Sequence, residues 1–343
     1  MVKRLLLMET SLMENQIKDI FEMPRRPHLL SLFLNNNDNL SRNEVLFKLP
    51  SDISRLVSIE LLDLSNSRIR EMPEGLKALV NLKCLNLEYT FDLIKIPRKL
   101  IFNFSRLHVL RLFGHAITSV LYGGDELIVK ELLGLKHLEV LSFTLRSSYA
   151  LKSFLSSRKL QSCTQALLFH RFEDSSLDVS CLVGLKLLKL KIDYKGGQFC
   201  FQSLRSVVID YCKELKDLTF LGFASNVKSI EVRSCFAMEE IISVGKFADV
   251  PEVMANLNPF VKLQYLQLAA LPNLKSIYWK PLPFSHLKEM NVFNCDKLKK
   301  LPLESNAAKE HKLDIRGEPD WWKQLEWEDE ATQNAFLPCF KPF

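Results

Sequence analysis

The sequence predicts an α/β solenoid built from stacked copies of one short repeat. Three segments have apolar residues at the same positions on either side of a shared cysteine: Leu204–Leu218, Val227–Ile241 and Leu287–Leu301. The first two begin 23 residues apart, and a period of this length with the pattern L-x-x-L-x-L-x-x-N/C is typical of a leucine-rich repeat. We therefore expect a curved horseshoe with a concave parallel β-sheet and an irregular or short-helical convex side.

Each repeat is expected to supply one short strand, because its apolar residues alternate with free positions. Alternate side chains of a strand point to opposite faces. Val207 and Ile209 should therefore point into the solenoid, whereas Ser206, Val208 and Asp210 should point outwards on the concave face. One repeat cannot bury its apolar side alone, so the copies must stack.

The turn after the strand carries cysteine where asparagine is usual in such repeats: Cys212, Cys235 and Cys295. A thiol is a small, mostly apolar filler with a weak donor, so we expect these side chains to be buried, reduced and free of metal. The chain has 8 cysteines and no CxxC pair. A disulfide or metal framework is the less favoured alternative.

Further copies of the strand pattern cover most of the chain: Leu29/Leu32/Leu34, Ile59/Leu62/Leu64, Leu82/Leu85/Leu87, Leu107/Leu110/Leu112, Leu138/Leu141/Phe143, Leu263/Leu266/Leu268 and Leu313/Ile315. The last of these lies 23 residues after Met290/Val292 and is predicted to follow it in register. The pattern is weak over 144–200, where one strand is expected near 166–169, and an insertion is expected at about 243–259.

This pattern predicts three parts: an irregular N-terminal repeat at 1–27, a leucine-rich-repeat domain at 28–315 and a C-terminal cap at 316–343. The end of a solenoid exposes the apolar interior of its final repeat. We therefore interpret Trp321, Trp322, Leu325 and Trp327 as the cap, in preference to an aromatic ligand cage.

Composition argues against several other classes of protein. The net charge is +6, and basic residues alternate with acids along the repeats, which is typical of a solvated surface, so no nucleic-acid groove is expected. Only four apolar residues separate Arg4 from Glu9, too few for a signal peptide or a membrane span. We therefore expect a reducing compartment.

The sequence contains no motif that indicates catalysis. It lacks the phosphate-binding loop G-x-x-x-x-G-K-[ST], the nucleophile motif G-x-S-x-G and the zinc motif H-E-x-x-H. Its 7 histidines are scattered without metal-ligand spacing. We expect a protein that is not an enzyme and that needs no cofactor or metal.

Several segments carry a more specific resemblance. HLLSLFLNNN (28–37), LLDLSNSRIREMPEGLKALVNLKCLNLEYT (61–90), FADVPEVMANLNPFVKLQYLQL (247–268) and WWKQLEWEDEATQNAFLPCF (321–340) resemble the leucine-rich-repeat region of plant coiled-coil-class nucleotide-binding (NB-ARC) disease resistance proteins. Matching segments run through nearly the whole chain in family order. The sequence carries neither the coiled coil nor the nucleotide-binding switch of that family, so no nucleotide-binding residue is carried over.

The resemblance implies a plant defence receptor with a cytoplasmic location. In that family the repeats help to recognise a pathogen effector or a guarded host protein, and they hold the nucleotide-binding domain inactive beforehand. A free-standing repeat scaffold that binds another protein without any switch is the alternative. An enzyme or ubiquitin-ligase component would need a catalytic or adaptor-binding segment, and none is visible.

The partner is expected to bind the concave face, where the third, fifth and seventh template positions stack into columns. The third-position column is Ser206, Ser229, Tyr265, Glu289 and Lys312; the fifth is Val208, Glu231, Gln267, Asn291 and Asp314; the seventh is Asp210, Arg233, Ala269, Phe293 and Arg316. Tyr265 and Phe293 resemble apolar anchors with a polar rim, although ordinary exposed residues would give the same pattern. The predicted partner-binding residues are Ser206, Val208, Asp210, Glu231, Arg233, Tyr265, Gln267, Asn291 and Phe293.

Overall fold

The computed structural model describes residues 10–11, 29–35, 48–114, 124–170, 203–243, 259–310 and 313–343. The chain divides into two compact units, Met1–Ala166 and Leu167–Phe343. The expected repeat domain 28–315 crosses this division, which falls inside the segment where the repeat pattern is weakest. The short interval 185–204 and the insertion near 243–259 lie almost entirely outside the described residues, as does most of 1–27.

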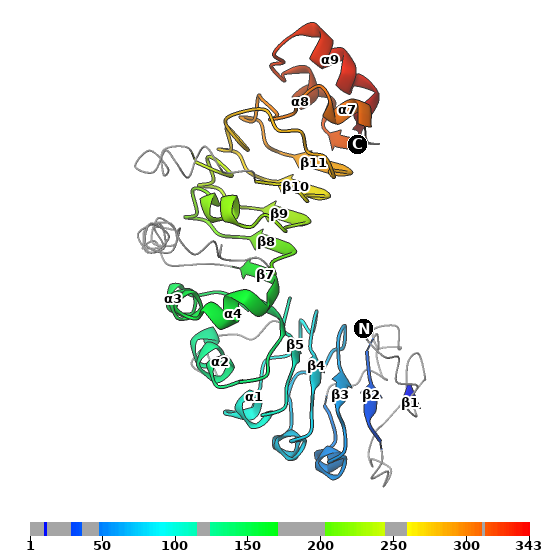
Figure 1. The fold of residues 1–343 in the computed structure, drawn as a ribbon, viewed down its shortest axis with the longest axis vertical. Coiled ribbons are helices and arrows are strands. Elements are labelled where there is room, and N and C mark those ends of the chain that lie inside the picture. Colours follow the sequence, from blue (N-terminus) through cyan, green and yellow to red (C-terminus); the bar gives the residue numbers. More distant parts are fainter. Residues whose placement is uncertain are drawn as a thin grey trace. The chain divides into compact units, whose positions relative to one another are not determined.

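The strands of the first unit are β1 (Thr10–Ser11), β2 (Ser31–Phe33), β3 (Leu61–Asp63), β4 (Cys84–Asn86), β5 (Val109–Arg111) and β6 (Val140–Leu145). Each strand lies parallel to the next in chain order (Figure 1). One leucine of each strand from β3 to β6 is in register with the next and almost fully buried: Leu62, Leu85, Leu110 and Leu141. This is the inward column that the alternating pattern predicts.

Short helices return the chain between these strands: η2 (Ser51–Arg55), η3 (Glu74–Ala78), α1 (Leu100–Asn103), α2 (Gly124–Leu133), α3 (Ser148–Ser156) and α4 (Arg158–Cys163). Pro50 and Pro73 cap the two 3₁₀ helices with extended dihedral angles, as the fixed φ of proline favours before a first helical turn. The turns then bury Ile53 and Leu76.

Strand β7 (Thr164–His170) lies mainly in the second unit and contains the strand that the sequence predicts near 166–169. The strands that follow are β8 (Ser206–Asp210), β9 (Ser229–Arg233), β10 (Tyr265–Ala269), β11 (Glu289–Phe293), β12 (Asp314–Gly317) and β13 (Phe340–Pro342). From β8 onwards each is parallel to the next. The helices are η5 (Thr219–Phe223), α7 (Ala307–Glu310), α8 (Pro319–Lys323), α9 (Glu330–Phe336) and η7 (Leu337–Cys339).

Both units therefore have the leucine-rich-repeat architecture that the period predicts. Val207 and Ile209 are fully buried, which confirms their predicted inward direction. The predicted register of the last repeat is wrong by two residues. Met290 pairs with Ile315, not with Leu313, and Val292 pairs with Gly317.

A left-handed residue directly follows each long strand of the second unit. Tyr211, Ser234, Ala270 and Asn294 have φ angles of 54°, 54°, 54° and 48°. This conformation is uncommon for residues other than glycine, and its recurrence shows that the stacked repeats impose it. In three of the four repeats a cysteine comes next and points inwards.

The three turn cysteines are buried, as predicted: Cys212, Cys235 and Cys295. The thiols of Cys235 and Cys295 each donate to the carbonyl two residues earlier, both at 3.2 Å. A hydrogen bond with Cys212 and then burial raise the pKa of Cys235, and burial raises the pKa of Cys295 to about 12. The thiols are thus held as neutral, weakly donating fillers.

The C-terminal segment covers the last repeats with aromatic rings. Trp321 is buried and donates from Nε1 to the carbonyl of Leu298 at 2.9 Å. Trp322 stacks on Phe340 with ring centroids 4.3 Å apart. Gly317 leaves room for this arrangement, because a Cβ atom there would lie 2.7 Å from the Trp321 ring. Strand β13 within this segment extends the parallel order beyond β12, which the sequence pattern does not predict.

Candidate functional site

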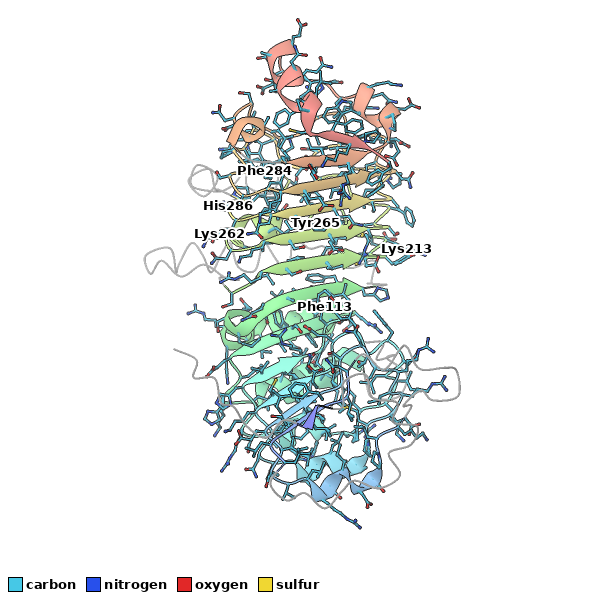
Figure 2. The ribbon with its side chains drawn as sticks, turned by 90° about the vertical axis from the view of Figure 1, so that its right-hand side faces the viewer. Phe113, Lys213, Lys262, Tyr265, Phe284 and His286 are labelled. Atoms are coloured by element: carbon cyan, nitrogen blue, oxygen red, sulfur yellow. The ribbon has the colours of Figure 1, made fainter. Side chains whose placement is uncertain are left out.

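The outward residues of β8 to β12 form a continuous surface, which we call the strand face of the second unit (Figure 2). Strand pairing places them in three columns: Ser206, Ser229, Tyr265, Glu289 and Asp314; Val208, Glu231, Gln267, Asn291 and Arg316; and Asp210, Arg233, Ala269 and Phe293. The first four members of each column agree with the prediction. The fifth members are wrong, since the register moves Asp314 beside Glu289 and Arg316 beside Asn291, while Lys312 lies outside the described residues.

Tyr265 lies at the centre of a hydrogen-bond network on this face. Its hydroxyl donates to Gln267 Oε1 at 2.6 Å and accepts from Asn291 Nδ2 at 3.3 Å. Asn291 Nδ2 also donates to Glu289 Oε1 at 2.9 Å, and Arg316 lies 3.8 Å from the same carboxylate. Burial raises the pKa of Tyr265. The ring is therefore a neutral, preoriented group and not a freely rotating surface side chain.

The other end of the strand face is held by two ion pairs of Arg233 and by a contact between a histidine and an aspartate. Arg233 lies 3.9 Å from Asp210 and 3.6 Å from Glu231. His170 Nδ1, on β7, lies 3.3 Å from Asp210. These partly exposed contacts each stabilise the fold only weakly, but together they fix the positions of the charged groups.

Two predicted contact residues are buried, which corrects the expectation that these outward positions are exposed. Val208 is 4% exposed and Asn291 is 7% exposed. Val208 is a short side chain in register with the longer Glu231. Asn291 is covered because Tyr265 and Glu289 both bond to its amide. These two residues support the surface instead of projecting from it.

Phe293 is paired with a second aromatic ring that the sequence pattern does not identify. Phe343 packs on it with ring centroids 4.2 Å apart and is itself 60% exposed. The aromatic-rich end of the chain is the only sequence signal for this contact. The predicted anchor is thus a two-ring surface formed by Phe293 and Phe343.

Two polar atoms on the strand face have no hydrogen-bond partner among the described residues. They are Arg233 Nε, a donor, and Asn291 Oδ1, an acceptor, and both are buried. Buried polar atoms are rarely left unpaired in folded proteins, and leaving one unpaired costs about 1–3 kcal/mol. Arg233 Nε lies 3.9 Å from Asp210 Oδ1, so the charge of its donor is compensated by this ion pair.

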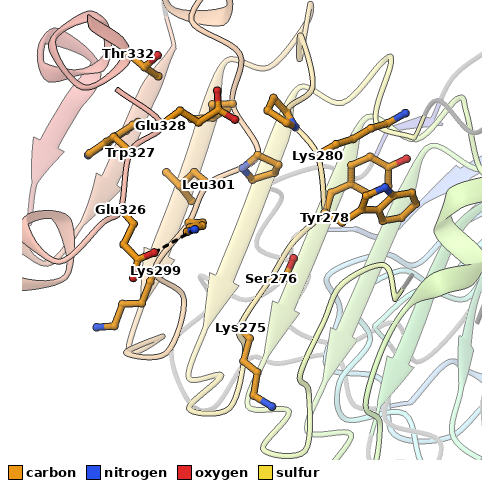
Figure 3. Close-up of a pocket in the computed structure, with 15 residues that line it drawn as sticks. Lys275, Ser276, Tyr278, Lys280, Lys299, Leu301, Glu326, Trp327, Glu328 and Thr332 are labelled. Atoms are coloured by element: carbon orange, nitrogen blue, oxygen red, sulfur yellow. Dashed lines mark ion pairs between the residues drawn. The ribbon is translucent and has the colours of Figure 1, made fainter. Parts of the chain in front are cut away.

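A hollow of about 330 Å³ lies away from the strand face, between the loops after β10 and β11 and the C-terminal segment (Figure 3). Lysines and aromatic rings line it, but two of the lysines already have carboxylate partners. Lys300 lies 3.2 Å from Glu326, and Lys275 lies 2.8 Å from Glu239. We interpret the hollow as the junction where the C-terminal segment packs on the last repeats.

The described residues contain no group of three or more histidine, cysteine, aspartate or glutamate side chains placed to hold a metal ion. Among those same residues, no helix combines the length and the apolar character that crossing a bilayer requires.

Residues 185–314 match the family described as "Plant disease resistance protein RPS2-like, leucine-rich repeats". Three curated relatives from Arabidopsis thaliana are each 36% identical to the chain: probable disease resistance protein At1g12290, disease resistance protein RPS5 and disease resistance protein SUMM2. The alignments cover 96%, 96% and 97% of this chain, and 40%, 40% and 41% of the relatives. The chain thus spans about two fifths of their length.

Solved structures with lower similarity include an internalin, InlF, from Listeria monocytogenes. It is 12% identical, with a TM-score of 0.42 over 85% of this chain and 82% of that chain. A plant peptide hormone receptor, RGFR1 in complex with RGF2, is 16% identical, with a TM-score of 0.38 over 87% of this chain and 50% of that chain.

Proposed function

Since this chain corresponds to the leucine-rich-repeat region of plant disease resistance proteins, we propose that it is the protein-recognition module of an intracellular immune receptor. In this proposal the strand face of the second unit binds a pathogen effector or a guarded host protein. The same repeats hold the nucleotide-binding domain of a full-length receptor inactive until that partner arrives. The compartment is the cytoplasm.

One observation carries the recognition role: the ordered polar surface around Tyr265. Protein interfaces concentrate their binding energy in preoriented aromatic and arginine side chains surrounded by a polar rim. The strand face offers Tyr265, the Phe293–Phe343 pair and Arg233 in this arrangement.

A free-standing binding scaffold would use the same surface without any switch, so the two functions differ in what accompanies the repeats. Sequencing of the full-length transcript discriminates between them. If the chain is part of a receptor, an in-frame phosphate-binding loop should be encoded upstream of it. If it is a free-standing scaffold, no such loop should be found.

The autoinhibitory role is tested by binding in trans. The upstream nucleotide-binding domain and this chain, expressed as separate polypeptides, should form a complex that calorimetry detects. Tyr265→Ala should weaken a complex made through the strand face by about 1–3 kcal/mol. Phe236→Ala is the matched control, because Phe236 is an exposed aromatic (47%) in the turn after β9. Equal losses from both variants would place the interface elsewhere.

A further inference from the structure

The edge of the second unit where the strands begin is lined with basic side chains. The residues that directly precede β8 to β11 are Arg205, Lys228, Gln264 and Lys288, and backbone hydrogen bonds of 2.7–2.9 Å join each to the next. Two residues earlier in their repeats lie Lys262 and His286. Figure 2 shows Lys262 and His286 at this edge, with Tyr265 on the strand face beside them. We call Arg205, Lys228, Lys262, His286 and Lys288 the basic edge.

The lysines of the basic edge are not neutralised within the described residues. All five side chains of the edge are exposed. Lys262 donates to Asn226 Oδ1 at 2.7 Å, and His286 Nδ1 lies 3.0 Å from the carbonyl of Val261. Lys228 and Lys288 make no ion pair in the described part of the chain.

The local sequence explains why these lysines lack an acidic neighbour. The segments 203–206, 225–229, 260–265 and 284–289 contain one carboxylate among them, Glu289. That side chain belongs to the strand face, where it contacts Arg316 and Asn291. Neighbouring strands lie about 4.8 Å apart, so Arg205 and Lys228 are adjacent like charges, which destabilise a sheet.

Some other lysines of the same unit are paired with a carboxylate. Lys275 pairs with Glu239, Lys300 with Glu326 and Lys341 with Asp314. Lys297 and Lys299, like Lys262, bond instead to amide oxygens, those of Asn273 and Gln324. The basic edge differs in that its cations follow one another along the starts of adjacent strands. Such a row of one sign attracts a partner of the opposite sign and speeds its association.

We propose that the basic edge docks an acidic segment of the protein that the strand face recognises. This inference rests on the proposed function and adds the chemistry of the partner: carboxylates above the basic edge, next to groups that complement the mixed charges of the strand face.

The surroundings favour a protein over a nucleic acid or a membrane. Asp210, Glu231 and Glu289 lie on the adjoining strand face and would repel a phosphate backbone or an anionic lipid surface. The aromatic rings at this edge, Phe260 and Phe284, are 4% and 3% exposed and stack on each other, so they offer no platform for bases. A polypeptide can place carboxylates on one row and amides or cations on the next.

The test uses a fluorescein-labelled twelve-residue peptide of alternating glutamate and serine. Anisotropy titrations of the full chain should give saturable binding at about 50 mM salt that weakens strongly at about 500 mM, because exposed charges are screened. The Lys228→Gln/Lys288→Gln double variant should bind about tenfold more weakly at the lower salt concentration.

The matched control is Lys275→Gln/Lys300→Gln, which removes the same charge from lysines that already have partners. It should leave peptide binding within about twofold of the unchanged chain. Equal losses from the two double variants would overturn the proposal, because only net charge would then matter. The absence of saturable binding would overturn it as well, and thermal melts of each variant establish that it is folded.

Two further probes decide the class of partner. A single-stranded oligonucleotide or a vesicle containing phosphatidylserine that binds more tightly than the peptide would overturn the proposal in favour of that class. Tyr265→Ala separates this inference from the proposed function. It should weaken binding of the protein that the strand face recognises, and it should leave the affinity for the acidic peptide unchanged. If the peptide binds but the nucleotide-binding domain forms no complex with this chain, the autoinhibitory role is contradicted while the inference about the basic edge still stands.

Discussion

In the first unit, the residues directly before β3 to β6 are Glu60, Lys83, His108 and Glu139, and Lys83 lies 2.7 Å from Glu60. At the same template position of the second unit stand Arg205, Lys228, Gln264 and Lys288, with no acid among them. Both rows are held by the same backbone hydrogen bonds between neighbouring repeats. The fold therefore does not require a particular charge here, and this solvated position is free to serve binding.

The buried turn position that follows each strand also carries different residue types in the two units. The first unit places hydroxyls there, Ser67 and Thr90, whereas the second uses Cys212, Cys235 and Cys295. Every one of them is at most 3% exposed. Stacking thus buries this position and accepts a hydroxyl, a thiol or, at Leu271, an aliphatic side chain, each of them neutral.

The largest effect should come from breaking that neutrality. Cys235→Asp would place a carboxylate in a fully buried turn without a cation, and it should lower the free energy of unfolding by more than about 3 kcal/mol. Denaturant titration measures the loss. Cys235→Ser is the neutral control and should lose much less. A stable Cys235→Asp protein would show that the turn is open to solvent.

A hydroxyl matters in the first unit only where it is bonded. Thr90 Oγ1 donates to the carbonyl of Leu87 at 2.7 Å, so Thr90→Val should cost about 1–3 kcal/mol. Ser67 Oγ is buried without a hydrogen-bond partner in the described part of the unit. Ser67→Ala should therefore be neutral or slightly stabilising by the same measurement, and equal losses would contradict this difference.

Alkaline pH should separate a buried thiol from its replacement. An unperturbed cysteine has a pKa of 9.0, and burial raises the pKa of Cys295 to about 12. Its contribution to stability is complete below pH 9 and declines between pH 9 and about 12, because the unfolded chain releases the proton first. Between about pH 8 and about pH 10, Cys295→Ala should therefore lose about 1 kcal/mol less stability than the unchanged chain. Parallel losses in both proteins would refute burial as the cause.

The smallest effects should come from the residues directly before the strands, where one substitution in each unit should shift the melting temperature in opposite directions. Lys228→Glu would place an acid beside Arg205 and should raise the melting temperature, whereas Lys83→Glu would put two carboxylates together and lower it. Both changes should stay within about 1 kcal/mol, since the groups are exposed. The difference between the two variants should disappear at about 1 M salt. Two shifts of the same sign would show that the rows do not differ in charge balance.

Periodicity predicts the inward columns because alternation and stacking act on every repeat alike, as at Val207 and Ile209. It fails at β12 because Leu313 and Ile315 are both apolar and two residues apart, so either satisfies the pattern. Only the pairing with Met290 decides between them. A strand pattern of period two is insensitive to such a shift.

The candidate site could be predicted less completely, because burial on the strand face depends on neighbours that are distant in sequence. Asn291 is covered by Tyr265, a residue of the preceding strand, and Phe293 packs on Phe343 at the end of the chain. Column positions follow from spacing alone. The side-chain contacts that turn a column into a surface do not.

Gly317 has a consequence for how the number of repeats can change. The inward position that holds Ile209, Val232, Leu268 and Val292 in successive strands holds glycine in β12, and the Trp321 ring occupies the vacated space. Duplication or loss of a whole repeat between β8 and β11 would join aliphatic surfaces that already fit one another. The same event between β11 and β12 would set a new aliphatic layer against a surface shaped for glycine and indole. Variation in repeat copy number should therefore concentrate before Val292.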